Sequence, residues 1–417
     1  MEALGKIKRA WLVTAAGTLI NFFLGVCYTW SLFARNLVEE SGWSQAEAAL
    51  PYTLLTICYS LFMVPAGSFQ DKLGARRITT LGAIFAGTAF LLGSFATTPL
   101  LMAFFFGFFY GVGIACCYVS LTPAAIKWFS TEKSGLISGI VVSGTGASAL
   151  IASPLVNILL QHYEVHNTMR LLGVIVFGAC IVLAQFVAEP EQKIRYNLAD
   201  NPSRKEDDSV QLTEYNYKEM LKTGQFYQLW LMLCLSAGTG LMFIAHLDSI
   251  VLHLLSIPVG FIMVSLFSLS NALGRLIAGA LADRLGSIKA MTLVFLLMCM
   301  AWVLLLVPSS MLTVSAATLI AGFCYGGIYG VFPATIVNYY GLKNFGLNFG
   351  LLFTAISVAA LLGPYFGGLL FDLVDSYSIL FAVPLLFCLL VAFLSWRLSG
   401  TGGRFSCPAE KRGKMSS

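Results

Sequence analysis

The feature of this chain that most limits its possible folds is a series of apolar runs, each about 20 residues long. A run of this length with few charges can cross the hydrocarbon core of a bilayer as an α-helix. We count twelve such runs in the 417 residues. They lie near residues 10–34, 46–67, 77–96, 99–126, 135–160, 168–188, 226–248, 258–282, 289–307, 311–338, 346–371 and 376–397. The sequence therefore predicts an all-α polytopic membrane protein with twelve transmembrane helices.

The overall composition agrees with this prediction and excludes several other classes. Hydrophobic residues make up 58% of the chain and charged residues 11%, whereas a soluble domain carries about 25% charged residues. The net charge of +5 is spread over short loops, so we expect no nucleic-acid partner. The four histidines are scattered, and nine of the ten cysteines lie in apolar runs, where cysteine acts as a small packing residue. We therefore expect no disulfide framework, metal site or cofactor.

One polar segment divides the apolar runs into two sets of six. Residues 189–224 are dense in Lys, Arg, Asp and Asn, and they follow the sixth run. We predict a six-helix bundle over residues 1–188, a linker over 189–224, a second six-helix bundle over 225–400 and a tail over 401–417. Lysines and arginines gather in the linker, both terminal segments and alternate loops, whereas the opposite side holds little more than Arg35 and Arg170. By the positive-inside rule the termini and the linker are cytoplasmic.

The two predicted bundles share a sequence motif after their second runs. Residues 67–77 and 279–289 both follow the pattern G-x-x-x-D-(K/R)-x-G-x-x-(R/K), with Asp71 and Asp283 at the same place in each. Phe109–Gly113 in the fourth run is likewise similar in sequence to Cys324–Gly327 in the tenth. Because the two copies stand at matching places in the two halves, the halves are predicted to be pseudo-symmetric repeats.

The repeated motif resembles the signature of the major facilitator superfamily over residues 10–398 or so. Within that superfamily the chain resembles the monocarboxylate transporters and the related oxalate:formate antiporters. The residues that carry this likeness are Tyr28–Phe33, Lys127–Phe129, Arg275 ahead of Asp283, and Phe323–Tyr329. The resemblance implies two bundles related by a pseudo-twofold axis, a substrate site between them at mid-membrane, and alternating access.

The resemblance also implies a cytoplasmic gate built on the repeated motif. It assigns Asp71 with Arg76, and Asp283 with Arg284, to a latch that closes the cytoplasmic side in one state of the cycle. Breaking such a latch would shift the conformational population without touching the substrate. The alternative is that these residues are ordinary polar helix ends.

Arg275 stands inside the apolar run near 258–282, without an acid within two turns on its own helix. A guanidinium at mid-membrane costs about 2.5–3.5 kcal/mol on insertion scales, and it cannot lose its proton. It therefore needs a partner, and a small carboxylate substrate is the simplest one. The alternative is an arginine that only ties helices together through carbonyls and amides.

Four tyrosines and one asparagine are candidates to complete the site around Arg275. Asn271 lies one turn before Arg275 and can bind the substrate or orient the guanidinium. Many animal monocarboxylate transporters carry Asp at this place and Lys in the first span, but this chain has neither. The tyrosines lie on runs that line the cavity in the superfamily, or else they only pack in the core. These candidates are Tyr28, Tyr118, Tyr325 and Tyr329.

Three further residues are candidates for proton coupling or substrate binding. His246 and Asp248 lie near the end of the seventh run, and they are candidates for proton coupling because His titrates in the right range. The alternative for both is a solvated helix end without a role in transport. Thr145 in the fifth run offers a hydroxyl, although a Thr between two glycines is expected to bond its own helix backbone.

The nature of the substrate follows from a count of cations. Oxalate exchangers carry a second cation, a Lys, in the eleventh span, and alignment puts Ile356 at that position. A second carboxylate would therefore remain uncompensated. We predict a secondary transporter, not an enzyme, that moves a small monocarboxylate such as L-lactate or pyruvate together with H⁺, with Ile356 beside the methyl group.

Two other functions stay open from the sequence. One is a carboxylate exchanger, and the other is a membrane receptor or intramembrane enzyme, for which no nucleophile–base set is visible. We expect the protein to work as a monomer in the lipid bilayer of a bacterial inner membrane, with no protein partner.

Overall fold

A computed structural model of the chain describes residues 2–129, 134–190, 215–307, 310–341, 345–374 and 377–400. Every regular element in these ranges is helical. The N-terminal half holds α1 (Glu2–Leu24), η1 (Gly25–Thr29), α2 (Trp30–Ser41), α3 (Gln45–Leu73), α4 (Ala75–Gly93), α5 (Pro99–Met102), η2 (Ala103–Phe108), α6 (Phe109–Ile126), α7 (Ser134–His162) and α8 (Val165–Ala184). The C-terminal half holds α10 (Tyr217–Met220), α11 (Gly224–Leu255), α12 (Gly260–Leu285), α13 (Ser287–Leu306), α14 (Met311–Tyr340), α15 (Phe345–Phe353), α16 (Ala355–Ala360), η4 (Leu361–Tyr365), α17 (Phe366–Val374) and α18 (Tyr377–Gly400).

These elements combine into membrane-length spans, which confirms the predicted all-α membrane fold. Within the described ranges, eleven helices are long and apolar enough to cross a bilayer. The predicted third span corresponds to α4, with 19 residues, which is not among these eleven. Arg76 and Arg77 in its first turn lower its mean hydropathy.

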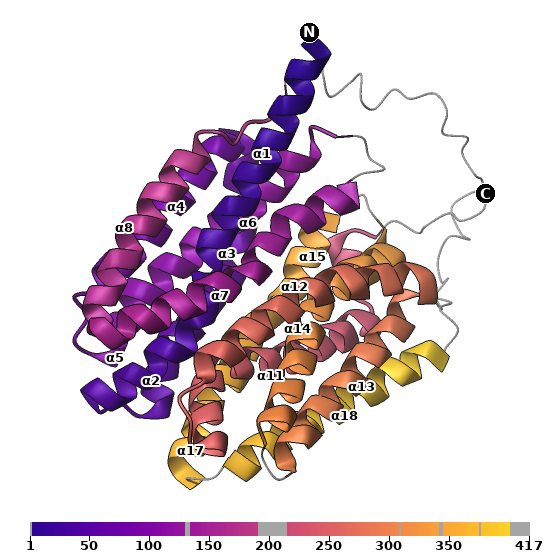
Figure 1. Cartoon of the computed structure of the whole chain (residues 1–417). Helices are drawn as coiled ribbons and strands as arrows, with labels where there is room; N and C mark the ends of the chain where they lie inside the picture. Colours follow the sequence, from indigo (N-terminus) through magenta and orange to yellow (C-terminus); the bar gives the residue numbers. More distant parts are fainter. Residues whose placement is uncertain are drawn as a thin grey trace.

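The two halves of the chain form separate bundles that lie side by side. Figure 1 shows the helices from α1 to α8 in one bundle and those from α11 to α18 in the other. The division falls where the sequence predicts it, between the sixth and seventh spans. Much of the predicted linker, residues 191–214, lies outside the described residues.

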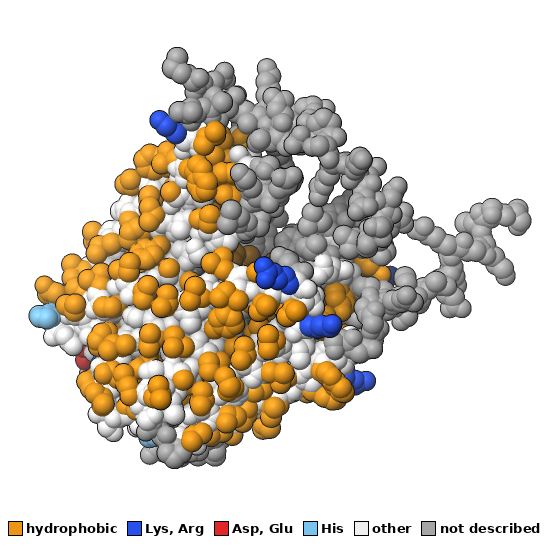
Figure 2. All heavy atoms as spheres, turned by 45° about the vertical axis from the view of Figure 1, so that its right-hand side comes forward, with side chains coloured by type: hydrophobic (Ala, Val, Ile, Leu, Met, Phe, Trp, Pro, Cys, Tyr) orange, Lys and Arg blue, Asp and Glu red, His pale blue; other side chains and the backbone are white. Residues whose placement is uncertain are grey.

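The outer surface of the bundles is apolar. In Figure 2 hydrophobic side chains cover most of the visible face, and only a few charged side chains interrupt them. Large apolar residues such as Leu312 and Leu100 are 79% and 74% exposed. A soluble monomer rarely exposes so large an apolar area, so this surface suits the hydrocarbon of a bilayer.

Three of the spans are interrupted by a turn that is not α-helical. The first passes through the 3-10 turn η1, the fourth through the π-helical turn η2, and the eleventh through η4, which contains Pro364. Irregular turns of this kind inside α-helices are frequent at functional sites. The turn η1 in particular brings Tyr28 to the boundary between the two bundles.

Candidate functional site

A cavity of about 40 Å³ lies between the two bundles. One water molecule needs roughly 10–15 Å³ of such space, so the cavity has room for about three waters or a ligand of a few heavy atoms. The wall is formed by η1, α3, α6 and α7 of the N-terminal half and by α11, α12 and α14 of the C-terminal half. The lining residues are Cys27, Tyr28, Tyr52, Leu55, Thr56, Tyr59, Ile114, Tyr118, Thr145, Leu241, Arg275, Tyr325 and Tyr329.

Arg275 is the one charged side chain on the described wall of this cavity. Its Nε donates to Oδ1 of Asn271 at 3.0 Å, and its Nη2 donates to the hydroxyl of Tyr28 at 3.1 Å. The guanidinium carbon lies 5.0 Å from the ring centroid of Tyr329, within cation–π range. These partners are all neutral, and no described carboxylate forms an ion pair with Arg275. The positive charge therefore remains available to an anion.

Close packing of α12 on α14 fixes the place of Arg275. A Cβ atom added to Gly326 would overlap the carbonyl oxygen of Asn271, and one added to Gly330 would lie 2.6 Å from that of Arg275. Gly274, from α12 itself, lies equally close to the backbone of α14. Glycine at these positions lets the two backbones touch. The helix that carries Arg275 and Asn271 is thereby held against its neighbour at the level of the cavity.

The four tyrosines singled out in the sequence all lie on the cavity wall. Tyr28 bonds to Arg275, and the hydroxyls of Tyr325 and Tyr329 lie 3.0 Å apart. Tyr118 packs edge-on against Tyr59, with ring centroids 5.8 Å apart. The structure thus gathers residues from three separate spans around one guanidinium.

Asn271 and Ile356 occupy different places from those expected of groups that touch a substrate. Asn271 is fully buried and acts on the cavity through Arg275, while its Nδ2 has no hydrogen-bond partner. Ile356 lies in α16, fully buried, and it is not among the lining residues of the cavity. The aliphatic side chains on the described wall are instead Leu55, Ile114 and Leu241.

The two proton-coupling candidates lie away from the cavity wall. Nε2 of His246 is 2.7 Å from the carbonyl oxygen of Pro364 in η4. Asp248 is 1% exposed, and its Oδ2 lies 3.0 Å from Nε of Arg35 in α2. Burial of this kind does not fit a solvated helix end. The pair between Asp248 and Arg35 joins the two bundles.

Further contacts between the bundles lie at the same end of the molecule as the pair of Asp248 and Arg35. At this end the helices α3 and α12 begin, and α2, α7, α11 and α17 end. Both carboxylate oxygens of Asp372 accept hydrogen bonds, at 2.9 Å each, from the backbone N–H groups of Gln45 and Ala46. A carboxylate in this position satisfies and stabilises the start of α3. The hydroxyl of Ser153 in α7 donates to the carbonyl of Phe261 in α12 at 2.7 Å. We call this the closed end.

The predicted cytoplasmic gate is only partly within the described side chains. The side chains of Asp71 and Asp283 lie outside them. Arg76 donates from Nε to the carbonyl of Val187 at 3.0 Å, within its own bundle, and Arg284 is exposed.

A polar cluster that the sequence did not reveal lies near the same place. Glu189 accepts from Lys127 at 3.0 Å and from Nε2 of Gln70 at 3.1 Å. These contacts join the end of α3 to the segments that follow α6 and α8 inside the N-terminal bundle.

One face of α3 lines the cavity. The sequence does not predict this role for its residues. Tyr52, Leu55, Thr56 and Tyr59 all line the wall. Their spacing of three, four and seven residues places them on one face of a helix. This spacing is visible in the sequence, but nothing local distinguishes a cavity face from a face packed in the core.

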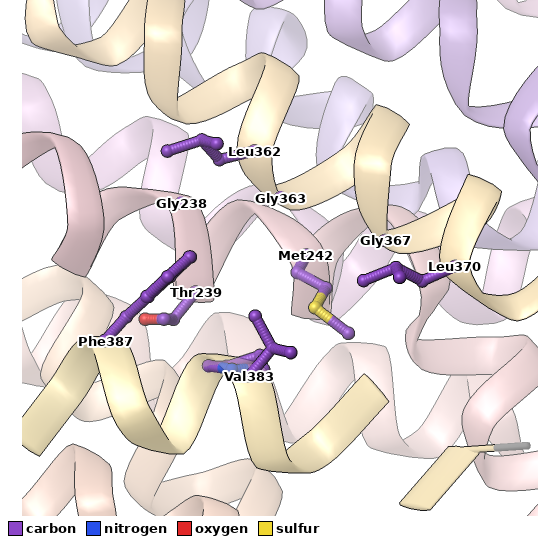
Figure 3. Close-up of a pocket in the computed structure, with 10 residues that line it drawn as sticks. Gly238, Thr239, Met242, Leu362, Gly363, Gly367, Leu370, Val383 and Phe387 are labelled. Atoms are coloured by element: carbon purple, nitrogen blue, oxygen red, sulfur yellow. The ribbon is translucent and has the colours of Figure 1, made fainter. Parts of the chain in front are cut away.

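A smaller void of about 20 Å³ lies inside the C-terminal bundle, between α11, the end of span eleven and α18. Figure 3 shows its wall, in which Met242 lies near Val383, Phe387 lies beside Thr239, and Leu362 stands on the opposite side. The hydroxyl of Thr239 on this wall already donates a hydrogen bond to the carbonyl of Ser236 at 2.7 Å. The void is thus an apolar packing gap beside η4.

Two bundles of membrane-spanning helices, with one cation on the described wall of the cavity between them, are the architecture of a membrane transporter. The chain belongs to the major facilitator superfamily, whose family model matches residues 11–261 and 252–405. This family is one of membrane transporters and not of enzymes.

Several relatives cover most of the chain. The MFS-type transporter YhjX of Escherichia coli is 27% identical over 364 residues, which are 85% of this chain and 86% of that protein. The oxalate:formate antiporter of Oxalobacter formigenes is 28% identical over 383 residues, or 88% of this chain and 86% of the relative. Monocarboxylate transporter 12 of Xenopus laevis is 23% identical over 354 residues, or 79% and 76% of the two chains. The expected family resemblance is confirmed.

Solved structures show the same fold at low identity. A bacterial homologue of the human lysosomal transporter Spinster, inward-facing and occupied, matches with a TM-score of 0.69 at 15% identity, over 94% of this chain and 98% of that one. The nucleoside transporter NupG matches with a TM-score of 0.70 at 12% identity, over 94% and 100% of the chains.

Proposed function

We propose that this transporter moves small monocarboxylates, such as L-lactate or pyruvate, together with a proton by alternating access. The observation that carries the proposal is the set of partners around Arg275. Its guanidinium contacts only neutral groups among the described residues, namely Asn271, Tyr28 and the ring of Tyr329. A carboxylate in the cavity would supply the missing negative charge through charge-assisted hydrogen bonds.

The single cation on the described cavity wall supports a substrate with one carboxylate. No second charged side chain lines the described cavity wall, and a dicarboxylate would bring a second anion into a place of low dielectric. The tyrosine hydroxyls can donate hydrogen bonds to the carboxylate while their rings form an apolar wall. The oxalate:formate antiporter among the relatives supports a second candidate function, the exchange of one carboxylate for another.

Coupling to a proton makes the uptake of an anion energetically favourable. Moving one negative charge inward against a negative-inside potential costs about 2.3 kcal/mol per 100 mV, whereas an anion moving with one proton carries no net charge. We propose Asp248 as the proton carrier, with His246 as a second candidate. Protonation of Asp248 would remove the negative charge that pairs with Arg35 at 3.0 Å. Because this ion pair joins the two bundles, its loss would allow the closed end to open.

The proposed orientation follows from the distribution of basic residues. Both termini would face the cytoplasm of a bacterial cell across its inner membrane, and the closed end would face outward. The latch of Asp71, Arg76, Asp283 and Arg284 would then operate on the cytoplasmic side. We propose that the protein works as a monomer, because the cavity is complete within one chain.

Uptake of labelled L-lactate into proteoliposomes tests the proposed function. With an inward proton gradient we expect accumulation above the external concentration, and without the gradient only slow equilibration. Uptake that ignores the gradient but is accelerated by internal carboxylate would identify an exchanger instead. Binding without accumulation would place the chain among receptors and contradict transport.

Asp248→Asn tests the proton carrier, since it keeps the shape of the side chain and removes its charge. We expect gradient-driven accumulation of lactate to fall roughly tenfold or more, which is within the usual range of coupling between sites. Exchange of internal for external lactate should persist, because the cavity is unchanged.

The matched control for Asp248 is Glu39→Gln. Glu39 also approaches Arg35, at 3.6 Å, but its side chain is 55% exposed, and exposed pairs contribute little. This variant should accumulate lactate as the unaltered protein does. Normal gradient-driven accumulation by Asp248→Asn would exclude Asp248 as the proton carrier.

A further inference from the structure

Thr145 is a hydroxyl-bearing residue of the cavity wall whose oxygen has no partner. The residue is 9% exposed, and its Oγ1 is buried and makes no hydrogen bond among the described residues. The expected bond to the backbone of its own helix is therefore absent, and that expectation is wrong. Thr56 on the same wall shows the usual arrangement, because its hydroxyl donates to the carbonyl of Tyr52 at 2.9 Å.

The two glycines that flank Thr145 determine where it lies. A Cβ atom on Gly144 would overlap the carbonyl oxygen of Thr18 in α1, and one on Gly146 would lie 3.2 Å from Cα of Ala272 in α12. Because α7 is packed against both helices at this level, the residue between the two glycines is held at the junction of α1 and α12.

Thr145 also packs against the turn η1, which carries Tyr28. The carbonyl oxygen of Thr145 would lie 2.6 Å from a Cβ atom on Gly25, at the start of the turn that carries Tyr28. Tyr28 in turn accepts the hydrogen bond of Arg275. Thr145 and Arg275 therefore stand on one cavity wall, and no hydrogen bond prevents the hydroxyl from rotating about χ1 toward a ligand.

This arrangement offers two different kinds of contact to one small molecule. Arg275 supplies a charged donor for a carboxylate, and Thr145 supplies a neutral group that both donates and accepts. A hydroxyl cannot compensate a second negative charge, but it can pair with a neutral oxygen. In a short monocarboxylate the atom next to the carboxylate is carbon 2.

Resting on the proposed function, we propose that Thr145 recognises the oxygen on carbon 2 of the substrate. The site then selects 2-hydroxy and 2-oxo monocarboxylates over unsubstituted acids of the same length. A site with a polar group for a substrate hydroxyl rejects the analogue that lacks it, because the protein group then stays unpaired.

The test compares L-lactate, pyruvate and propionate as labelled substrates for three proteins in proteoliposomes. Thr145→Val keeps the branched shape without the hydroxyl, and Thr145→Ser keeps the hydroxyl. We expect the Val variant to lose roughly fivefold to tenfold in kcat/KM for lactate and pyruvate, in the range of one hydrogen bond. The ratio of kcat/KM for lactate to that for propionate should fall severalfold, because propionate has no oxygen on carbon 2, and the Ser variant should restore this ratio.

The propionate measurement also separates the possible failures. If the Val variant transports propionate normally and keeps the original ratio of lactate to propionate, the role of Thr145 is wrong although the proposed function stands. If the unaltered protein accumulates none of the three acids, the proposed function is wrong and the role of Thr145 falls with it.

Discussion

Replacement of Arg275 by Gln is expected to abolish saturable uptake of monocarboxylates, with a loss in kcat/KM of roughly 100-fold or more. The reason is that the described cavity wall holds no other charge to receive the carboxylate. Gln can still donate a hydrogen bond, but it cannot neutralise an anion removed from water. The measurement is the initial rate of labelled lactate uptake into proteoliposomes at several concentrations.

Two further variants show what the loss means. Arg275→Lys keeps the charge without the planar fork, so it should retain partial uptake with a raised KM. Arg397→Gln removes an exposed arginine near the end of α18, and its uptake should equal that of the unaltered protein. A folded Arg275→Gln variant with normal uptake would reduce Arg275 to a residue that only joins helices.

Replacement of Gly326 by Leu is expected to have the second largest effect, on both stability and transport. The added side chain would meet the carbonyl oxygen of Asn271 on α12. The backbone cannot move aside as a flexible side chain can, so the two helices must separate. We expect this to lower the free energy of unfolding by about 3 kcal/mol or more, which is the upper end of the usual cost of overpacking. Asn271 and Arg275 would move with α12, and we expect a lower Tm in detergent together with loss of lactate uptake.

Gly178→Leu is the matched control for this effect. Gly178 lies in the middle of α8, and a Cβ atom added there would meet nothing within 4 Å. The same substitution should therefore leave Tm and uptake close to their original values. If Gly326→Leu keeps the original Tm and uptake, the close contact of α12 with α14 does not position the site.

The sequence predicts much of the fold because membrane spans are a local property. Each apolar run is long enough to define its own helix, and the polar break after residue 188 separates the halves without any tertiary information. Arg275 could be predicted for the same reason, since a cation inside an apolar run is conspicuous at once. The tyrosines of spans one, four and ten followed from family resemblance.

The rest of the site depends on the rotation of each helix, which the sequence does not display. The face of α3 with Tyr52 and Tyr59 has ordinary core composition, and only the packing of the bundles turns it toward the cavity. Alignment predicts Ile356 on the cavity wall, but Ile356 is not among its lining residues. Span eleven, however, is broken between α15 and α16 and again at η4, and such breaks change the face a helix presents. The partner of Asp248, Arg35, lies in the opposite bundle and had no local signal.

The hydrogen bond between Arg275 and Tyr28 ties the one cation of the cavity wall to the relative position of the two bundles. Nη2 of the guanidinium on α12 donates at 3.1 Å to a hydroxyl from η1 of the other bundle, while no described hydrogen bond engages Nη1. The planar fork therefore has further N–H donors for a carboxylate beside the contact that joins the halves. A rocking movement that separates the bundles at this level must break this contact, so the residue that would hold an anion also responds directly to the movement of the bundles.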